Sequence, residues 1–437
     1  MAISIERLYG YLSGDEDARV CKDIPDAACG DQPHNFLAYL GANLLGKVAD
    51  EIASAKLVIP WIFGALGVPT ALTGFLVPIR ESCKLLPQMA VAAVIRRLPQ
   101  RKGVWVVGAV LSAISLFGMA VAAFLLDGRS AGIAILVMLV LLSLAEGFCS
   151  VSAKDVLGKT VSKSRRGHLM GWSAGVSGLA VLAIGLSMSV LNPAEAGIRT
   201  FSALLVGGGL LWLIGALIFG TIVEQPGATA GGGNALAVAI GQLTLLARDR
   251  HFRRFVITRA LLLTVALAPP FYVLVARQQA AAGPAGLGIL IVANGLASSL
   301  SAPFWGRLGD RSSRTVMMLA AGGAGLLGVF TFLAVQGQWS WATGRAGFAV
   351  IFFLLNVMHS GLRLGRKVYL VDMSSVDNRA AYVAVSNTVI GVLMLVGGAV
   401  GFVGDRLGAP FTVLLLGVGA LIAAGYARSL PEVSDEA

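Results

Sequence analysis

Apolar residues occur in long continuous runs that recur along almost the whole 437-residue chain. A run of about 20 residues lets a helix cross a hydrocarbon core of roughly 30 Å at about 1.5 Å per residue. The runs do not alternate between polar and apolar positions, as the strands of a membrane barrel do, so they predict helices. We predict twelve spans, at residues 34–64, 67–95, 103–126, 131–153, 168–191, 199–222, 254–277, 285–306, 314–335, 343–370, 381–403 and 409–427.

The composition favours the same class of protein. Hydrophobic residues make up 56% of the chain and charged residues only 13%, with a mean hydropathy of +0.80. Soluble domains have roughly a quarter of their residues charged, so we expect an all-α integral membrane protein. The sequence has no Walker motif, no evident nucleophile–base pair and no zinc-ligand spacing. We therefore expect no enzyme activity, no cofactor and no metal site.

The net charge of +11 is concentrated in alternate loops. Lys and Arg cluster at 96–102, 159–166, 248–254 and 307–314, whereas the intervening loops, such as 192–198, are short or nearly uncharged. Cytoplasmic loops of membrane proteins carry such an excess of basic residues. This pattern predicts that both termini lie in the cytoplasm. We expect the protein itself in the inner (plasma) membrane of a bacterial cell. It does not favour nucleic acid as a partner.

The spans fall into two groups of six. The Pro- and Gly-rich stretch Glu224–Asn234, which cannot be helical, separates them. The groups also share a sequence pattern, since KDVLGKTVSKSRRG at 154–167 corresponds to KVYLVDMSSVDNRA at 367–380, as an internal duplication requires. The predicted organisation is a cytoplasmic segment at 1–33, a six-helix bundle at 34–222, a linker at 223–253, a second bundle at 254–427 and a tail at 428–437.

The loop between the eighth and ninth spans carries a motif. It reads GRLGDRSSRT, from Gly306 to Thr315, and includes Asp310, Arg311 and Arg314. This loop is similar to the Gly-x-Leu-x-Asp-Arg-x-Gly-Arg signature of the major facilitator superfamily of secondary transporters, with Ser313 in place of the second Gly. The resemblance covers about residues 34–427. It implies twelve helices in two pseudo-symmetric bundles, alternating access to a small-molecule substrate, and a monomer in the lipid bilayer.

Three departures from the superfamily's patterns limit this resemblance. The first-half counterpart of the loop, AVIRRLPQRK at 93–102, has no acidic residue. The fourth span reads LLSLAEGFCS, with Glu146 but without the superfamily's arginine motif. The fifth span has no proline between Gly171 and Leu191, so the motif of drug–proton antiporters is absent. These departures do not favour multidrug export.

Ionisable residues lie near the middle of the first two spans. They are Lys47, Asp50, Glu51 and Lys56 in the first, and Arg80, Glu81 and Lys84 in the second. A charge at the bilayer centre is costly and normally faces a protein-lined cavity. The group is interpreted either as a structural ion-pair cluster or as carboxylates that change protonation during transport. Glu146, alone among apolar neighbours, is the first candidate for a proton site, followed by Asp50, Glu51 and Glu81.

The tenth span carries a polar stripe at three- and four-residue steps. Its members are Asn356, His359, Ser360, Arg363 and Lys367. The resemblance implies that the first, fourth, seventh and tenth spans line the central cavity, so the stripe is expected to face substrate. The cavity bases Lys47, Arg80, Lys84 and Arg363 suit an anionic or zwitterionic solute, because a guanidinium fork matches carboxylate or phosphate.

Two further expectations concern three glycines of the fifth span and the N-terminal segment. Gly171, Gly175 and Gly178 of the fifth span are interpreted as helix contacts that permit rocking. The N-terminal segment has an amphipathic stretch from Ile3 to Leu12, and its thiols Cys21 and Cys29 are expected to stay reduced in the cytoplasm.

The sequence thus predicts a secondary transporter, with protons as the coupling ion. Two other functions stay open. A lipid-handling translocase would have a groove between spans that opens toward lipid, and a non-transporting scaffold or sensor would have fully paired intramembrane charges and no cavity.

Overall fold

The structure is a computed structural model that describes residues 5–13, 24, 26–84, 97–190, 197–227, 241–279, 284–374 and 379–433. All regular secondary structure in these ranges is helical, which confirms the predicted all-α class. Ten helical stretches within the described residues are long and apolar enough to cross a membrane, and they correspond to the third to twelfth predicted spans. The single helices among them are α7 (Lys102–Leu125), α8 (Gly128–Thr160), α9 (Lys163–Ser189), α10 (Ile198–Gly220), α16 (Pro284–Arg311), α17 (Ser313–Gln336), α19 (Arg345–Asp372) and α22 (Ala409–Ala427).

The other two of the ten stretches are composite. The seventh predicted span combines α13 (Arg250–Leu261), α14 (Leu263–Leu267) and α15 (Pro269–Gln279), and the eleventh combines α20 (Arg379–Gly397), a short 3-10 turn and α21 (Gly401–Leu407). Pro269 and Pro270 lack the backbone N–H that a continuous helix would use, which explains the break before α15.

The first two predicted spans are not single helices in the structure. The first is divided into α3 (Gln32–Ile52) and α4 (Val58–Ala65), and the second begins with α5 (Thr70–Thr73) and a helical stretch at 76–84. The rest of the second span lies outside the described residues. Pro60 accounts for the first break, because a continuous helix would need its missing N–H to bond the carbonyl of Lys56. Ten of the twelve predicted spans are thus observed as long stretches, and the first two are interrupted within the residues that the structure describes.

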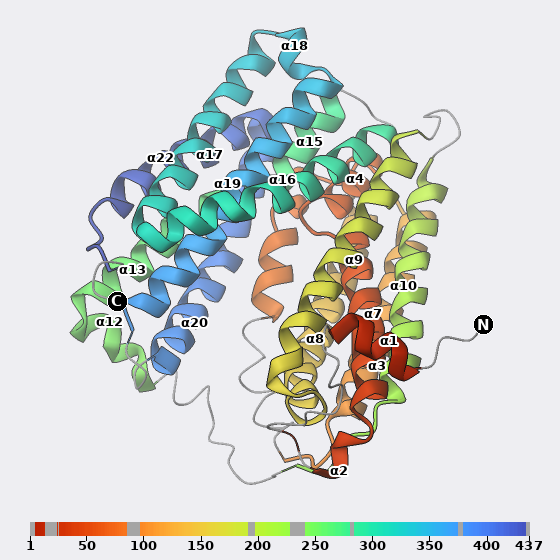
Figure 1. Ribbon diagram of the computed structural model, residues 1–437. Helices are drawn as coiled ribbons and strands as arrows, with labels where there is room; N and C mark the ends of the chain where they lie inside the picture. Colours follow the sequence, from red (N-terminus) through yellow and green to blue (C-terminus); the bar gives the residue numbers. More distant parts are fainter. Residues whose placement is uncertain are drawn as a thin grey trace.

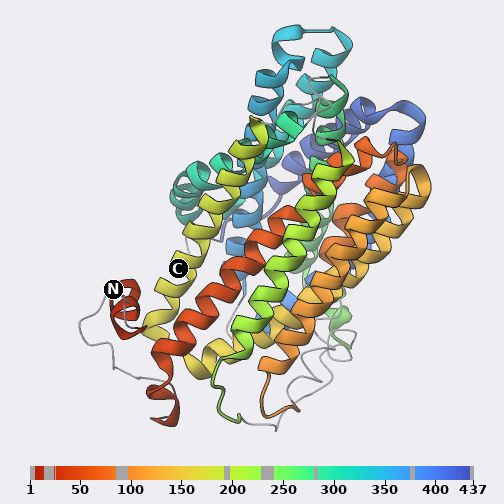
Figure 2. The same ribbon diagram turned by 90° about the vertical axis from the view of Figure 1, so that its right-hand side faces the viewer.

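The helices form two bundles (Figure 1). In the first, α10 packs against both α3 and α7, and the three run side by side in Figure 2 as the red, lime and orange helices. Trp105 of α7 stacks on Phe219 of α10 with ring centroids 4.1 Å apart. In the second, α17 packs against α19 and α22. The domain boundaries drawn from the sequence stay predictions, since the linker at 223–253 lies partly outside the described ranges.

Short helices complete the structure: α1 (Ile5–Ser13), α2 (Asp26–Cys29), α12 (Leu245–Arg248) and α18 (Ser340–Thr343). The predicted amphipathic stretch forms α1, whose buried Tyr9 hydroxyl accepts a hydrogen bond of 2.7 Å from Gln32 of α3. Cys29 is disulfide-bonded, so the expectation of a reduced thiol there was wrong.

The two bundles meet through α4 with α15, α5 with α21 and α9 with α16. These contacts lie at the end of the molecule opposite the basic loops, which we call the closed end. There, Arg277 of α15 donates a hydrogen bond of 2.6 Å to the carbonyl of Gly64, and the backbone N–H of Ala71 donates one of 2.9 Å to Asp405. Toward the other end, which holds the basic loops and is called the basic end, the bundles diverge, and α8 and α20 lie apart in Figure 1.

Glycines bring the backbones together at the closed end. A Cβ on Gly288 of α16 would lie 2.5 Å from the carbonyl oxygen of Gly185 in α9, and one on Gly74 would lie 2.8 Å from Gly401. By contrast, a Cβ on Gly171, Gly175 or Gly178 would meet nothing within 4 Å. The interpretation of these three as packing positions was therefore wrong: α9 touches α16 at Gly185, and the other three lie where the bundles have separated.

Candidate functional site

Arg80 is the centre of an ion-pair network inside the first bundle. Its Nη2 lies 2.5 Å from Oε1 of Glu146 in α8 and 3.3 Å from Oδ1 of Asp50 in α3. Lys84 donates a hydrogen bond of 3.1 Å to the other oxygen of Glu146. The Glu146 side chain is only 3% exposed. Glu146 is therefore not isolated, contrary to the interpretation from its neighbours along α8, because its partners come from another helix.

Lys56 connects this network with the second bundle. It lies in the break between α3 and α4, with its Nζ 3.6 Å from Oε1 of Glu81 and 3.1 Å from Nε2 of His359 in α19. The break removes Lys56 from the helical register of α3 and lets it reach across the interface. The structure thus brings the charged middles of the first two predicted spans to the polar stripe of the tenth.

A polar cavity of about 520 Å³ adjoins the network, between α3, α9 and α16. Lys47, Asp50 and Glu51 line it from α3. The opposite walls carry Gly175, Ser177 and Gly178 from α9, and Asn294, Ser298 and Ser299 from α16. Glu51 is exposed here, and no ion pair of the described residues includes it or Lys47, although the two are spaced to share a helix face. This is the side-chain environment that a charged solute would meet.

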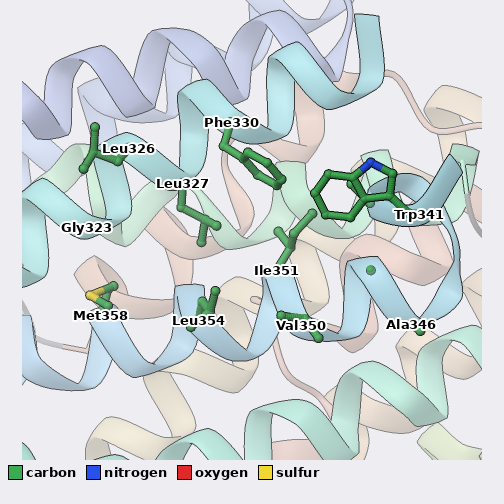
Figure 3. A pocket seen from close by; sticks show the side chains of 12 residues that line it. Gly323, Leu326, Leu327, Phe330, Trp341, Ala346, Val350, Ile351, Leu354 and Met358 are labelled. Carbon is green, nitrogen blue, oxygen red and sulfur yellow. The ribbon is translucent and has the colours of Figure 1, made fainter. Parts of the chain in front are cut away.

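A larger cavity of about 630 Å³ lies elsewhere, between α17, α18 and α19 (Figure 3). Its lining is apolar and includes Leu327, Phe330, Trp341 and Ile351. Such a surface offers no charged group that could pair with a charged solute, and Trp341 and Leu326 of its lining are exposed. We therefore assign the candidate site to the polar cavity.

The members of the α19 stripe have different environments. Asn356 is buried and donates to the carbonyl of Phe352 in its own helix, which is a structural role. Ser360 is half-buried, and His359 contacts Lys56. Arg363 and Lys367 are exposed, and Arg363 has no hydrogen bond or salt bridge within the described chain, although it interacts electrostatically with Glu51 and Lys56 of the first bundle. Arg363 therefore faces the space between the bundles.

Arg259 of α13 is a further site residue that the sequence analysis missed. Its guanidinium donates hydrogen bonds to the Ser386 hydroxyl and to the Asn387 side-chain oxygen of α20. It interacts electrostatically with Arg366 of α19, which in turn interacts with Arg363 and with Glu81. Arg259 comes soon after the basic cluster at 248–254, so nothing in the sequence distinguishes it from the basic residues of the loop. In the structure, α13 already begins at Arg250.

The two bundles differ in the charges that they bring to this region. The first contributes equal numbers of carboxylates and bases, namely Asp50, Glu51, Glu81 and Glu146 against Lys47, Lys56, Arg80 and Lys84. The second contributes Arg259, Arg363, Arg366 and Lys367, and within its described helices no salt bridge joins any of these to an acid. The first bundle therefore contributes no net charge to this region, and the second bundle makes its own side of the region cationic.

Comparisons with known proteins agree with this architecture. Residues 260–436 match the family model of the Major Facilitator Superfamily. The chain is similar to the solved nucleoside transporter NupG (TM-score 0.68, 14% identity, 90% of this chain and 98% of that one). It is also similar to a POT family transporter in complex with 5-aminolevulinic acid (0.68, 12%, 89% and 94%) and to the inward open xylose transporter XylE from E. coli (0.62, 14%, 91% and 96%). The second half of the chain thus matches this family, and the fold of nearly the whole chain is similar to that of these solved transporters. No curated protein matches its sequence.

The loop signature spans the end of α16 and the start of α17: Gly306 to Arg311 are the last residues of α16, and Ser312 is the N-cap of α17. The Ser312 side chain accepts a hydrogen bond of 3.1 Å from the N–H of Thr315, and Glu432 contacts both Ser312 (2.6 Å) and Arg314 (3.4 Å). Asp310 is exposed, and Gly306 has open space beside it. No hydrogen bond or salt bridge within the described part joins Asp310 or Arg311 to another side chain, so their gating role stays a prediction.

The first bundle replaces the missing acid of its own loop. The buried Glu224, just after α10, accepts hydrogen bonds from the backbone N–H groups of Arg101 and Lys102 (2.8 and 2.7 Å) and pairs with Lys159 at 3.0 Å. Arg101 also pairs with Asp155 of α8. A carboxylate that follows the sixth span thus lies at the start of the third.

Proposed function

We propose that this protein is a secondary transporter that moves a small anionic or zwitterionic organic solute by alternating access, coupled to protons. The observation that carries the proposal is the charge difference between the bundles. A solute that entered between them would meet Arg259, Arg363 and Arg366, none of which forms a salt bridge within the described chain. Because an unpaired intramembrane charge is costly, such residues favour a counter-charge from the substrate.

The arrangement of the bundles supports alternating access. They touch at the closed end through close backbone contacts at Gly185, Gly288 and Gly74, and the cavity beside Glu51 lies toward the basic end. By the positive-inside rule, the basic end is the cytoplasmic one, so the structure corresponds to a cytoplasm-open state. Opening the other side requires these small-residue contacts to separate, which rocking of two rigid bundles achieves.

Proton coupling is supported by the geometry around Arg80. One guanidinium nitrogen lies within 3.3 Å of both the Asp50 and the Glu146 carboxylate. Two like charges so placed repel each other, and a proton on either removes the repulsion while the other still pairs with Arg80. Asp50 and the cavity-lining Glu51 are the members that a proton from the cavity would reach first, whereas Glu146 is enclosed by Arg80 and Lys84.

One observation favours a second candidate function, lipid translocation. The cavity lies between α9 and α16, and its lining includes Leu179 and Leu296, which are exposed. An acyl chain could lie beside these residues while an anionic head group reached the bases inside. The scaffold function fits less well, because Arg363 lacks a bonded partner among the described residues and the cavity is present.

Transport by reconstituted protein tests the proposal. Solutes whose levels differ between cells with and without the protein are assayed for uptake into vesicles, with and without a pH gradient. Arg363→Ala should fold normally and lose binding, and Arg363→Lys should restore it only in part, because the planar fork is lost. Arg428→Ala changes an exposed arginine after α22 and serves as the matched control. Normal uptake by a folded Arg363→Ala protein would return the α19 stripe to a structural role, and uptake of phospholipid alone would favour the translocase.

A further inference from the structure

Arg259 is held in a fixed position by neutral partners. Its Nη1 donates to the Ser386 hydroxyl, and both terminal nitrogens lie 3.3 Å from the side-chain oxygen of Asn387. The guanidinium carbon also lies 5.9 Å from the centre of the Phe255 ring. Hydroxyl and amide oxygens orient a guanidinium without neutralising it, so the full positive charge of Arg259 is retained in the bundle interior.

The same guanidinium keeps an unused donor. Its buried Nε has no hydrogen-bond partner within the described chain. A buried donor without an acceptor costs about as much as a lost hydrogen bond, so it is uncommon unless a ligand completes it. The arrangement of Arg259 is thus that of a preorganised donor for an anionic acceptor.

A second arginine lies close enough to Arg259 to interact with it electrostatically. Arg366 of α19 interacts electrostatically with Arg259, and the two like charges oppose each other. Among the described residues, the carboxylate that interacts electrostatically with Arg366 is Glu81, which is already paired with Lys56 at 3.6 Å. Arg363, one helical turn before Arg366, adds a third positive charge to the same side of the site. No salt bridge within the described chain neutralises Arg259, Arg363 or Arg366.

We infer that Arg259 and Arg366 form a subsite for a substrate group or groups carrying two negative charges, as in a dicarboxylate or a phosphate monoester. Each guanidinium can bind a carboxylate or phosphate face through two parallel N–H donors. A substrate with a single negative charge would neutralise one of the two arginines and leave the other without a counter-charge. A substrate with two negative charges would neutralise both. Ser386 and Asn387 are positioning residues that aim Arg259. The inference rests on the proposed transport of anions and specifies their charge.

Ligand binding by the purified full-length protein tests the subsite directly. Succinate and inorganic phosphate are compared with butyrate, acetate and the uncharged succinamide at equal ionic strength, by the shift of the thermal unfolding midpoint and by titration. We expect the dissociation constant of at least one dianion to be at least about tenfold lower than that of the monoanions. The succinate and phosphate arms separate the two sources of the charge.

Two variants locate the binding. Arg259→Gln removes the charge but keeps a polar side chain, and Asn387→Asp supplies an internal carboxylate that should neutralise Arg259 in a folded protein. Both should weaken dianion binding at least about tenfold, since each takes away a charged hydrogen-bonding partner. Arg250→Gln, at an exposed position of the same helix, should leave it unchanged.

The possible outcomes separate the subsite from the transport proposal. Equal binding of monoanions and dianions, or no binding of any anion, would overturn the two-charge subsite. Undiminished dianion binding by both variants would show that Arg259 is not part of it. Vesicle uptake restricted to neutral or cationic solutes would overturn the proposed anion transport itself.

Discussion

Glu224 and Glu432 hold equivalent positions in the two bundles. Each follows the last helix of its bundle, and each contacts the start of the third: Glu224 accepts from the N–H groups of Arg101 and Lys102, and Glu432 contacts Ser312 and Arg314. The first N–H groups of a helix have no partner inside the helix, and a negative charge there is favourable. The internal duplication thus extends to a pair of carboxylates that tie each bundle's basic end together.

Because the two carboxylates differ in burial, their removal should cause unequal losses of stability. Glu224→Ala leaves two backbone N–H groups and Lys159 without their buried acceptor, and should cost about 3 kcal/mol of stability, as expected for a broken buried ion pair. Glu432→Ala, whose side chain is 23% exposed against 0% for Glu224, should cost clearly less. Unfolding midpoints of the detergent-solubilised variants measure the difference. Equal losses in the two variants would contradict the importance of burial here.

The sequence predicted the third to twelfth spans because their apolar runs are continuous. It could not predict the break at 53–57, since the effect of Pro60 was concealed in a long hydrophobic stretch. The partners of Glu146 could not be read either, because they depend on which faces of α3, α8 and the helix carrying Arg80 meet. Glu224 was interpreted as the first residue of the Pro- and Gly-rich stretch in the linker, and its contact with Lys102, 122 residues away in the chain, has no local signal.

The ion pairs of Arg80 change what substitutions of the carboxylates should do. Glu146→Gln leaves Arg80 and Lys84 with one partner fewer in a buried site, so it should reduce folding yield rather than remove proton coupling selectively. Glu51→Gln, at an exposed position without a salt bridge in the described chain, should fold normally, lose accumulation driven by a pH gradient and retain substrate exchange. Expression, accumulation and exchange are measured on both. Full accumulation by Glu51→Gln would exclude it as a coupling residue.

The glycine contacts at the closed end predict a shift between the two open states. Gly288→Ala places a methyl group 2.5 Å from the Gly185 carbonyl, which should separate α9 from α16. If the substitution destabilises the contact between α9 and α16 by about 1.4 kcal/mol, the population ratio of the two open states changes about tenfold. Cysteines introduced into the cavity should then react faster with impermeant reagents from the closed-end side. Gly175→Ala, where a Cβ meets nothing within 4 Å, is the matched control, and equal labelling of the two variants would contradict this role.

Asp249, just before α13, predicts a dependence of stability on pH. Burial would raise the pKa of this carboxyl, but hydrogen bonds from the Tyr382 hydroxyl and the Phe252 backbone N–H outweigh it and hold the pKa below its usual value. A lowered pKa in the folded protein gives a stabilisation that is complete above the unfolded value of about 3.9 and is lost as the pH falls through the folded value.

Asp249→Asn should therefore lower the unfolding midpoint at neutral pH and flatten its fall in acid below about pH 4. Tyr382→Phe should have the same direction with a smaller effect, because the Phe252 N–H bond remains. Asp249 also accepts this bond as the N-cap of α13, the helix that carries Arg259, so its loss should loosen the site as well as the helix. Unfolding midpoints between pH 3 and pH 7 measure both effects. An acid dependence of Asp249→Asn equal to that of the parent protein would show that this carboxylate does not stabilise the fold.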